Sequence, residues 1–171
     1  ETGHNVGPSH TDIITTVIEM DFLLGYLIER LERLKIYDKM DMFVVSDHGM
    51  VDVSSERLIS LERYLSRMDY IYINGNGSHV QLDIMKDHED YAEALMEELI
   101  NIPNCQAWEK DKIPKRFQFI NDNTGDYLLL ADEGWFITTK TIEEVPFTLG
   151  GMHGYDPALQ SMHGIFYAVG V

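Results

Sequence analysis

The residues Phe43-Val44-Val45-Ser46-Asp47-His48-Gly49-Met50 combine an apolar run with two adjacent polar side chains. The run Met42 to Val45 is typical of a short parallel strand that is covered on both faces. Asp47 and His48 follow at its carboxyl end, where open α/β sheets bind their ligands, and Gly49 lets the backbone turn sharply. An adjacent carboxylate and imidazole suit Zn²⁺. The alternative interpretation is a turn in which Asp47 only caps the backbone.

A long amphipathic helix is predicted ahead of this strand, from Thr11 to about Leu34. Apolar residues recur there at spacings of three and four. They are Ile13, Val17, Met20, Leu24, Leu27, Leu31 and Leu34. A coiled coil fits the same spacing, but the apolar strand that follows favours one helix packed on a sheet. A helix followed by a strand is half of a βαβ unit, and the missing strand is expected upstream of Glu1, in a longer protein.

The stretch 51–144 is predicted to be an α+β lobe inserted into that core. The expected elements are a helix over Glu56–Arg67, strands Tyr70–Ile73 and Val80–Ile84 joined by the turn Asn74-Gly75-Asn76-Gly77, a helix over Asp87–Ile100, and strands Gln106–Glu109, Tyr127–Ala131 and Trp135–Thr138. This order lacks the regular alternation of a parallel α/β fold. It suggests a split, ferredoxin-like sheet.

Composition excludes several classes of protein. Hydrophobic residues make up 44% and charged residues 25% of the 171 residues, which is typical of a globular chain. The net charge of -16, from 29 acidic and 13 basic side chains, argues against a nucleic-acid polymer as partner but not against a small phosphate compound. No apolar run is long enough to form a transmembrane segment.

Two histidines outside the central strand share its setting, because each lies beside glycine in an expected loop. Gly3-His4 opens the chain within the loop predicted for Glu1–His10, and His153-Gly154 lies near its end, before a final strand over residues 165–171. The one cysteine, Cys105, allows no disulfide within the chain. It is expected to pack as a small apolar residue.

Three spaced motifs resemble the nucleotide pyrophosphatase/phosphodiesterase family of the alkaline phosphatase superfamily. They are Glu1-Thr2-Gly3-His4-Asn5-Val6-Gly7-Pro8, Ser46-Asp47-His48-Gly49-Met50, and His153-Gly154-Tyr155-Asp156 with Ser161-Met162-His163. The connections Ile113-Pro114-Lys115-Arg116-Phe117 and Leu130-Ala131-Asp132-Glu133-Gly134-Trp135 are also similar. The resemblance implies that residues 1–50 and 145–171 are parts of an alkaline-phosphatase-like α/β core, with 51–144 as the inserted lobe.

The resemblance also implies two zinc ions close together. His4 and His153 match ligands of one ion, whose Asp ligand is expected directly before Glu1. Asp47 and His48 match ligands of the other, whose further ligands are an upstream Asp and the nucleophilic Thr. The implied reaction is hydrolysis of a phosphodiester or pyrophosphate bond of a nucleotide through a phosphorylated threonine. This chain alone is then expected to be inactive.

Other functions remain open from the sequence. Relatives in the same superfamily cleave choline phospholipids or phosphonates, and the lobe is also compatible with a non-catalytic binding or interaction domain. Family members of this kind usually act outside the cytoplasm, so the resemblance implies an extracytoplasmic location. The expected partner is a small nucleotide or phosphodiester.

Overall fold

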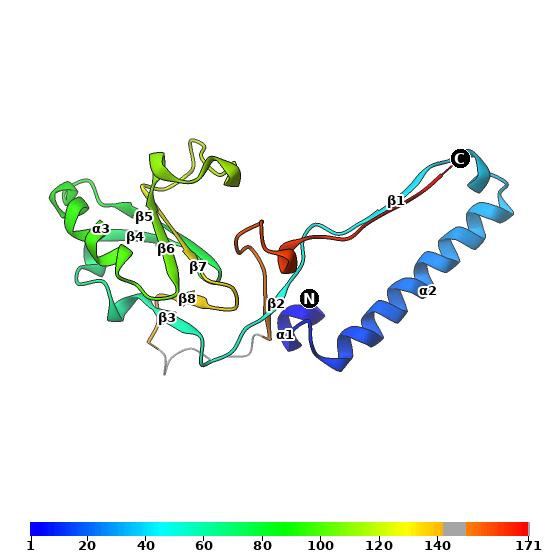
Figure 1. Ribbon diagram of the computed structural model, residues 1–171, viewed down its shortest axis with the longest axis horizontal. Coiled ribbons are helices and arrows are strands. Elements are labelled where there is room, and N and C mark those ends of the chain that lie inside the picture. The colour runs from blue at the N-terminus through cyan, green and yellow to red at the C-terminus, as the bar shows by residue number, and fades with distance from the viewer. Residues whose placement is uncertain (142–149, 171) are drawn as a thin grey trace.

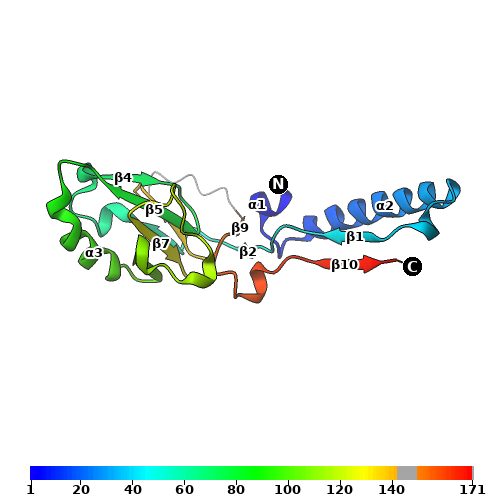
Figure 2. The ribbon, with the colours of Figure 1, turned by 90° about the horizontal axis from the view of Figure 1, so that it is seen from above.

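The computed structural model of the chain describes residues 1–141 and 150–170. The helices are α1 (Thr2–Val6), α2 (Thr11–Arg33) and α3 (Ala92–Ile100), and the strands are β1 (Met42–Val45), β2 (Val51–Asp52), β3 (Leu58–Ser60), β4 (Ile71–Asn74), β5 (His79–Ile84), β6 (Cys105–Glu109), β7 (Tyr127–Ala131), β8 (Phe136–Thr138), β9 (Gly151–Met152) and β10 (Phe166–Val169). The molecule is elongated. A lobe built from β3 to β8 and α3 lies at one end, α2 with the β1–β10 pair lies at the other, and α1, β2 and β9 lie between them (Figures 1 and 2).

The long helix expected from the apolar spacing is confirmed as α2. The ring of His10 caps it, accepting a hydrogen bond from the Asp12 amide at 3.2 Å. None of its residues is buried, and Phe22 is 73% exposed. The expected packing of α2 on a sheet is therefore not seen. None of the helices in the described ranges is long and apolar enough to cross a membrane.

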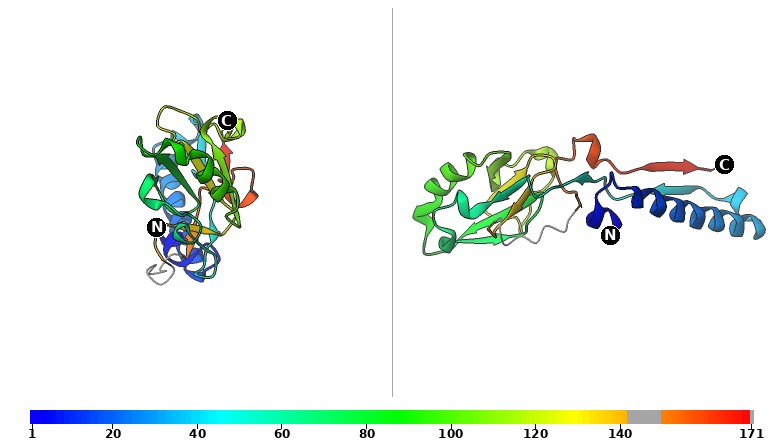
Figure 3. Two further views of the ribbon diagram at one scale, coloured as in Figure 1. Left: turned by 90° about the vertical axis from the view of Figure 1, so that its left-hand side faces the viewer. Right: turned by 90° about the horizontal axis from the view of Figure 1, so that it is seen from below.

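The strand predicted at Met42 to Val45 is confirmed as β1, but the prediction that it is parallel and covered on both faces is wrong. It pairs antiparallel with β10, Phe43 opposite Ala168 and Val45 opposite Phe166, in a two-stranded ribbon. Its residues alternate between half-buried and exposed, and Phe43 is 63% exposed. Away from the lobe the chain runs outward along α2, returns along β1 and runs outward again along β10, as the views in Figure 3 show.

The lobe holds the core of the molecule. Its four-stranded antiparallel sheet has the order β4-β5-β7-β6, and β3 and β8 form a separate parallel pair. Every residue of β7 is buried, as its continuous apolar run predicts. Helix α3 covers the sheet with Leu95 and Leu99, both fully buried. The predicted hairpin is confirmed as β4 and β5, and the strands predicted at 106–109, 127–131 and 135–138 appear as β6, β7 and β8.

Several sequence predictions are corrected by the structure. The helix expected over Glu56–Arg67 is wrong, because Leu58–Ser60 is strand β3 and only Leu61–Arg63 forms a 3₁₀ turn. Leucine spacing allowed a helix there, but pairing with β8, almost 80 residues away, extends the backbone. The loop expected at the amino terminus contains α1, and the helix expected from Asp87 becomes α-helical only at Ala92.

The mixed α/β class is confirmed, whereas the ferredoxin-like detail of the lobe is not. A ferredoxin-like sheet needs two crossover helices, and the described part of the lobe carries one α-helix, α3. The short β2–β9 pair joins the lobe to the part that carries α1 and α2. The boundary expected at residue 145 lies outside the described residues.

Candidate functional site

Four side chains predicted as ligands meet where α1, the end of β1 and the end of β9 converge. The ring of His153 stacks on that of His48, with centroids 3.6 Å apart and an interplanar angle of 21°. The ring of His4 lies 5.1 Å from that of His153, tilted by 57°. Asp47 contacts His48, its Oδ2 lying 3.3 Å from the Nε2 of the ring. The structure thus gathers residues that are up to about 150 positions apart in the sequence.

Close backbone approaches bring these segments together. The Gly150 amide donates to the His4 carbonyl at 2.7 Å, and β9 pairs with β2, Met152 opposite Val51. A Cβ at Gly151 would lie 2.4 Å from the Gly3 carbonyl oxygen, so this approach requires a residue without a side chain. Gly151, two residues before His153, is therefore a packing requirement of the site.

The second nitrogen of two of the rings is held by backbone. The Nδ1 of His4 lies 3.1 Å from the Gly151 carbonyl, and the Nδ1 of His48 lies 2.7 Å from the Gly49 carbonyl. A carbonyl oxygen only accepts, so in each of these hydrogen bonds Nδ1 is the donor. Backbone carbonyls that hold the second ring nitrogen in this way are typical of histidines that bind metal ions.

The protonation states at this cluster favour metal ligation. Burial lowers the pKa of His153, and the neighbouring His48 and His4 lower it further. The His48 amide, donating a hydrogen bond at 3.0 Å, lowers the pKa of Asp47. At neutral pH the His153 imidazole is therefore neutral and the Asp47 carboxylate is ionised, and these are the forms that bind zinc.

Imidazole and carboxylate are groups that bind zinc, but this cluster holds few of them. Across the described ranges, no three His, Cys, Asp or Glu side chains are grouped so as to hold one ion. The ring of His153 lies closer to His48 than to His4, with centroids 3.6 against 5.1 Å apart, so these distances do not divide the four residues into two pairs. Catalytic zinc usually has three protein ligands, so a site with two ions would need further ligands from elsewhere.

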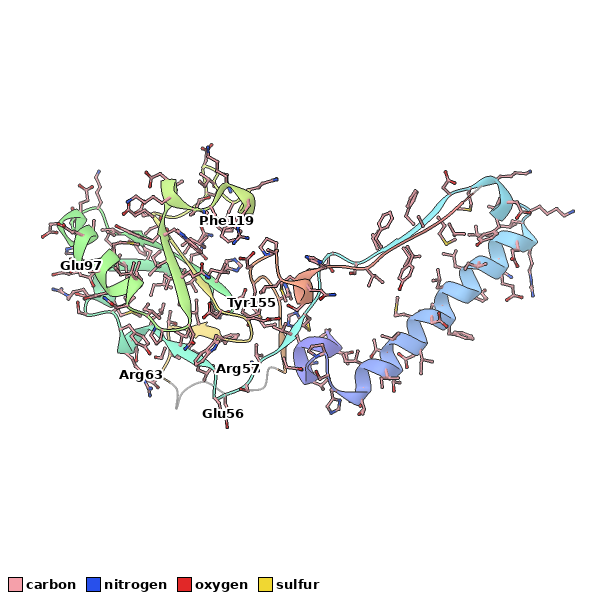
Figure 4. All side chains as sticks on the ribbon, viewed as in Figure 1. Glu56, Arg57, Arg63, Glu97, Phe119 and Tyr155 are labelled. Carbon is pink, nitrogen blue, oxygen red and sulfur yellow. The ribbon has the colours of Figure 1, made fainter. Side chains whose placement is uncertain are left out.

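The loop after His153 is fastened to the lobe, which the sequence did not reveal. The Tyr155 hydroxyl donates to the Trp135 carbonyl at 2.8 Å, and its ring is buried. Both terminal nitrogens of Arg116 donate to the two carboxylate oxygens of Asp156. Arg116 and Asp156 are 40 positions apart, so no local pattern marks the pair. Figure 4 shows Tyr155 on the side of the lobe nearest the centre of the molecule.

An apolar cavity of about 120 Å³ lies between this loop and the lobe. Its lining residues are His79, Phe117, Phe119, Leu128, Leu130, Gly154, Tyr155 and Pro157. Burial lowers the pKa of His79, so this ring is neutral at physiological pH. Cys105 lies in the lobe, where burial raises the pKa of its thiol to about 12. A thiol that stays protonated is no nucleophile, in agreement with the sequence interpretation.

Known proteins resemble this chain along almost all of its length. A profile of the family described as type I phosphodiesterase/nucleotide pyrophosphatase matches residues 1–156. Human ectonucleotide pyrophosphatase/phosphodiesterase family member 5 is 34% identical over 99% of this chain and 35% of its own length. Human bis(5'-adenosyl)-triphosphatase ENPP4 is 33% identical over 99% of this chain and 36% of its own length. The chain thus spans about a third of these relatives.

Solved structures show the same fold. Human ectonucleotide pyrophosphatase/phosphodiesterase 5 superposes with a TM-score of 0.88 at 32% identity, covering 99% of this chain and 44% of that one. An inactive variant of the murine protein in complex with AMP superposes with a TM-score of 0.89 at 34% identity, with the same coverage. The profile match and these superpositions, together with the histidines gathered at the ends of β1 and β9, show that the chain belongs to the type I phosphodiesterase/nucleotide pyrophosphatase family.

Proposed function

We propose that the full-length protein is a zinc-dependent phosphoric diester hydrolase that cleaves phosphodiester or pyrophosphate bonds of nucleotides. The observation that carries the proposal is the convergence of His4, His48 and His153, with Asp47 beside them, in a member of this family. The three histidines come from segments that are remote in the sequence, so no local structure brings their imidazole rings together. Function is the simplest reason, because stacked histidines add little to a core.

Each pair of residues has a distinct part in the proposal. His4 and His153 would hold one zinc ion, and Asp47 and His48 would hold the second. Two bound zinc ions supply activation of a hydroxyl nucleophile and stabilisation of charge on the phosphate oxygens. The backbone carbonyls of Gly151 and Gly49 accept from Nδ1 of His4 and His48, so Nε2 of each ring would be the atom available to an ion.

The remaining catalytic groups are proposed to lie outside the 171 residues. A threonine nucleophile, phosphorylated during the reaction, is proposed upstream of Glu1, and the family resemblance supports this part of the proposal. Residues 1–50 and 145–171 would belong to the catalytic core, with 51–144 as a lobe between them. An extracytoplasmic location, periplasmic, secreted or at the cell surface, completes the proposal.

Nucleotides are the proposed substrate class. One relative is named a bis(5'-adenosyl)-triphosphatase, and a murine structural neighbour was solved in complex with AMP. The net charge of -16 disfavours a polymer of phosphates more than a small nucleotide, since repulsion grows with the number of phosphates.

Hydrolysis assays on the full-length protein test the proposal. We expect turnover of a chromogenic nucleotide phosphodiester and of a dinucleoside polyphosphate, loss of both on zinc chelation, and recovery when zinc is added. His153→Ala should lower kcat/KM by at least 100-fold, whereas Arg67→Ala, at a half-buried residue of the lobe that pairs with Asp69, should retain it. Faster hydrolysis of lysophosphatidylcholine than of any nucleotide would instead assign the protein to phospholipids, and no turnover of any ester would refute the enzyme.

A further inference from the structure

The segment that carries His153 is held by few hydrogen bonds within its own backbone. Residues 153–159, between β9 and a 3₁₀ turn at Gln160–Met162, lie in no helix or strand. Gly154 adopts a φ of 86°, in the left-handed region. The backbone hydrogen bond within the segment runs from the Leu159 amide to the Asp156 carbonyl at 3.0 Å. The position of the segment therefore depends on side-chain contacts.

Those contacts come from the lobe. The guanidinium of Arg116 donates two parallel hydrogen bonds to the carboxylate of Asp156. The side chain of Asp156 is only 22% exposed, and its Oδ1 also accepts from the Ala158 amide at 2.9 Å. A bidentate pair of this kind fixes geometry as well as charge, unlike an ordinary exposed ion pair. Tyr155 adds a second attachment through its hydrogen bond to the Trp135 carbonyl.

We propose that Arg116 is a positioning residue, holding Asp156 so that the lobe sets the orientation of His153 and thereby the zinc affinity of the site. The inference rests on the proposed function, because it assigns His153 to zinc. The ring of His153 lies within 5.1 Å of two other rings, so a small shift of its loop changes which atoms face the shared space. Outer residues that orient a ligand typically contribute 10- to 100-fold to metal affinity.

The lobe offers a matched control for this pair. Arg67 also donates two hydrogen bonds to an aspartate, from Nε and Nη2 to Asp69 at 3.0 and 2.8 Å. That pair is local, two positions apart, and Asp69 is 65% exposed. Arg67→Ala therefore removes the same kind of interaction from the lobe without touching the His153 segment.

The experiment compares zinc affinity and hydrogen exchange in the full-length protein. In competition with a chromophoric chelator, Arg116→Ala should weaken the binding of one zinc ion by about 10- to 100-fold. Arg116→Lys keeps the positive charge but cannot form two parallel hydrogen bonds, so it should recover only part of this loss. Arg67→Ala should bind zinc as the wild type does. In the metal-free protein, Arg116→Ala should speed amide exchange in residues 151–159, and Arg67→Ala should not.

The outcomes separate the two proposals. Wild-type zinc affinity and unchanged exchange in Arg116→Ala overturn the positioning role and leave the proposed function intact. An equal loss of zinc affinity in Arg67→Ala also overturns it, because the effect would then be a general one on stability. If the wild-type protein binds no zinc, the proposed function fails. The exchange data then decide the positioning of the His153 segment on their own, faster exchange supporting it and unchanged exchange overturning it.

Discussion

At the scale of single residues, glycines decide whether the segments of the site can approach one another. Gly49 follows His48, and a Cβ there would lie 2.0 Å from the Ser161 carbonyl oxygen. A backbone atom cannot swing aside as a flexible side chain can. The chain therefore fixes the end of β1 against the turn that precedes β10 through a position where only glycine fits.

Gly49→Ala should consequently destabilise the protein by about 1–3 kcal/mol, the usual cost of overpacking. Gly25→Ala is the matched control, because nothing lies within 4 Å of its Cβ position and it sits inside α2. Removing a helical glycine should stabilise the 171-residue chain by about 0.5–1 kcal/mol. Urea denaturation measures both. Equal stability of the Gly49 variant and the wild type would show that the two segments do not lie as close as described.

Asp156 gives a prediction for the dependence of stability on pH. Its hydrogen bonds from Arg116 lower its pKa below the ordinary 3.8. A lowered pKa in the folded state adds stability that is present above the ordinary pKa and is lost as pH falls through the folded-state value. Asp156→Asn should therefore be less stable than the wild type at pH 6, and the difference should shrink towards pH 3. A difference in unfolding free energy that stays constant over this range would contradict an ionised pair.

At the scale of elements, α3 shows how one helix divides its residues between core and solvent. Leu99 is fully buried against the sheet, whereas its neighbour Ile100 is 59% exposed. Leu99→Ala should cost about 2–5 kcal/mol because it leaves a cavity. Ile100→Ala should change stability by less than about 0.5 kcal/mol. Chemical denaturation of the two variants checks this, and similar losses would mean that α3 packs through a different face.

The elements that could be predicted from the sequence are those whose pattern is local. Apolar spacing gave α2, the Asn-Gly turn gave the hairpin of β4 and β5, and a continuous apolar run gave β7. The strand β3 was missed because its partner β8 is remote, and leucine spacing at 58, 61 and 65 mimics a helix. Of the candidate site, motifs supplied all four ligand candidates. They could not supply the contact of Arg116 with Asp156, because it joins loops that are remote in the sequence.

At the scale of the whole molecule, apolar side chains are exposed on α2 and on the β1–β10 ribbon. Phe22 is 73%, Phe43 63% and Phe166 68% exposed, and the rings of Phe43 and Phe166 lie 6.0 Å apart. Large apolar side chains that are exposed to this extent promote association. The 171-residue chain on its own should therefore bind a hydrophobic dye and self-associate in sedimentation experiments.

Replacing Phe43 and Phe166 by serine should reduce both dye binding and self-association, because it removes two exposed aromatic rings that are diagonal neighbours across the strands. The double variant Tyr72→Ser/Ile100→Ser, which changes exposed side chains of the lobe, is the control and should leave association nearly unchanged. A chain that sediments as a monomer and binds no dye would show that these surfaces are covered in a way that the described residues do not reveal.

We propose that this protein works through two zinc ions, and the metal content of the full-length protein decides between this mechanism and a metal-free one. Elemental analysis after dialysis should find about two zinc ions per chain in the wild type. Asp47→Ala and His153→Ala should each lose about one. Absence of zinc from the wild type, or full occupancy in both variants, would contradict the assignment of His4, Asp47, His48 and His153 as ligands.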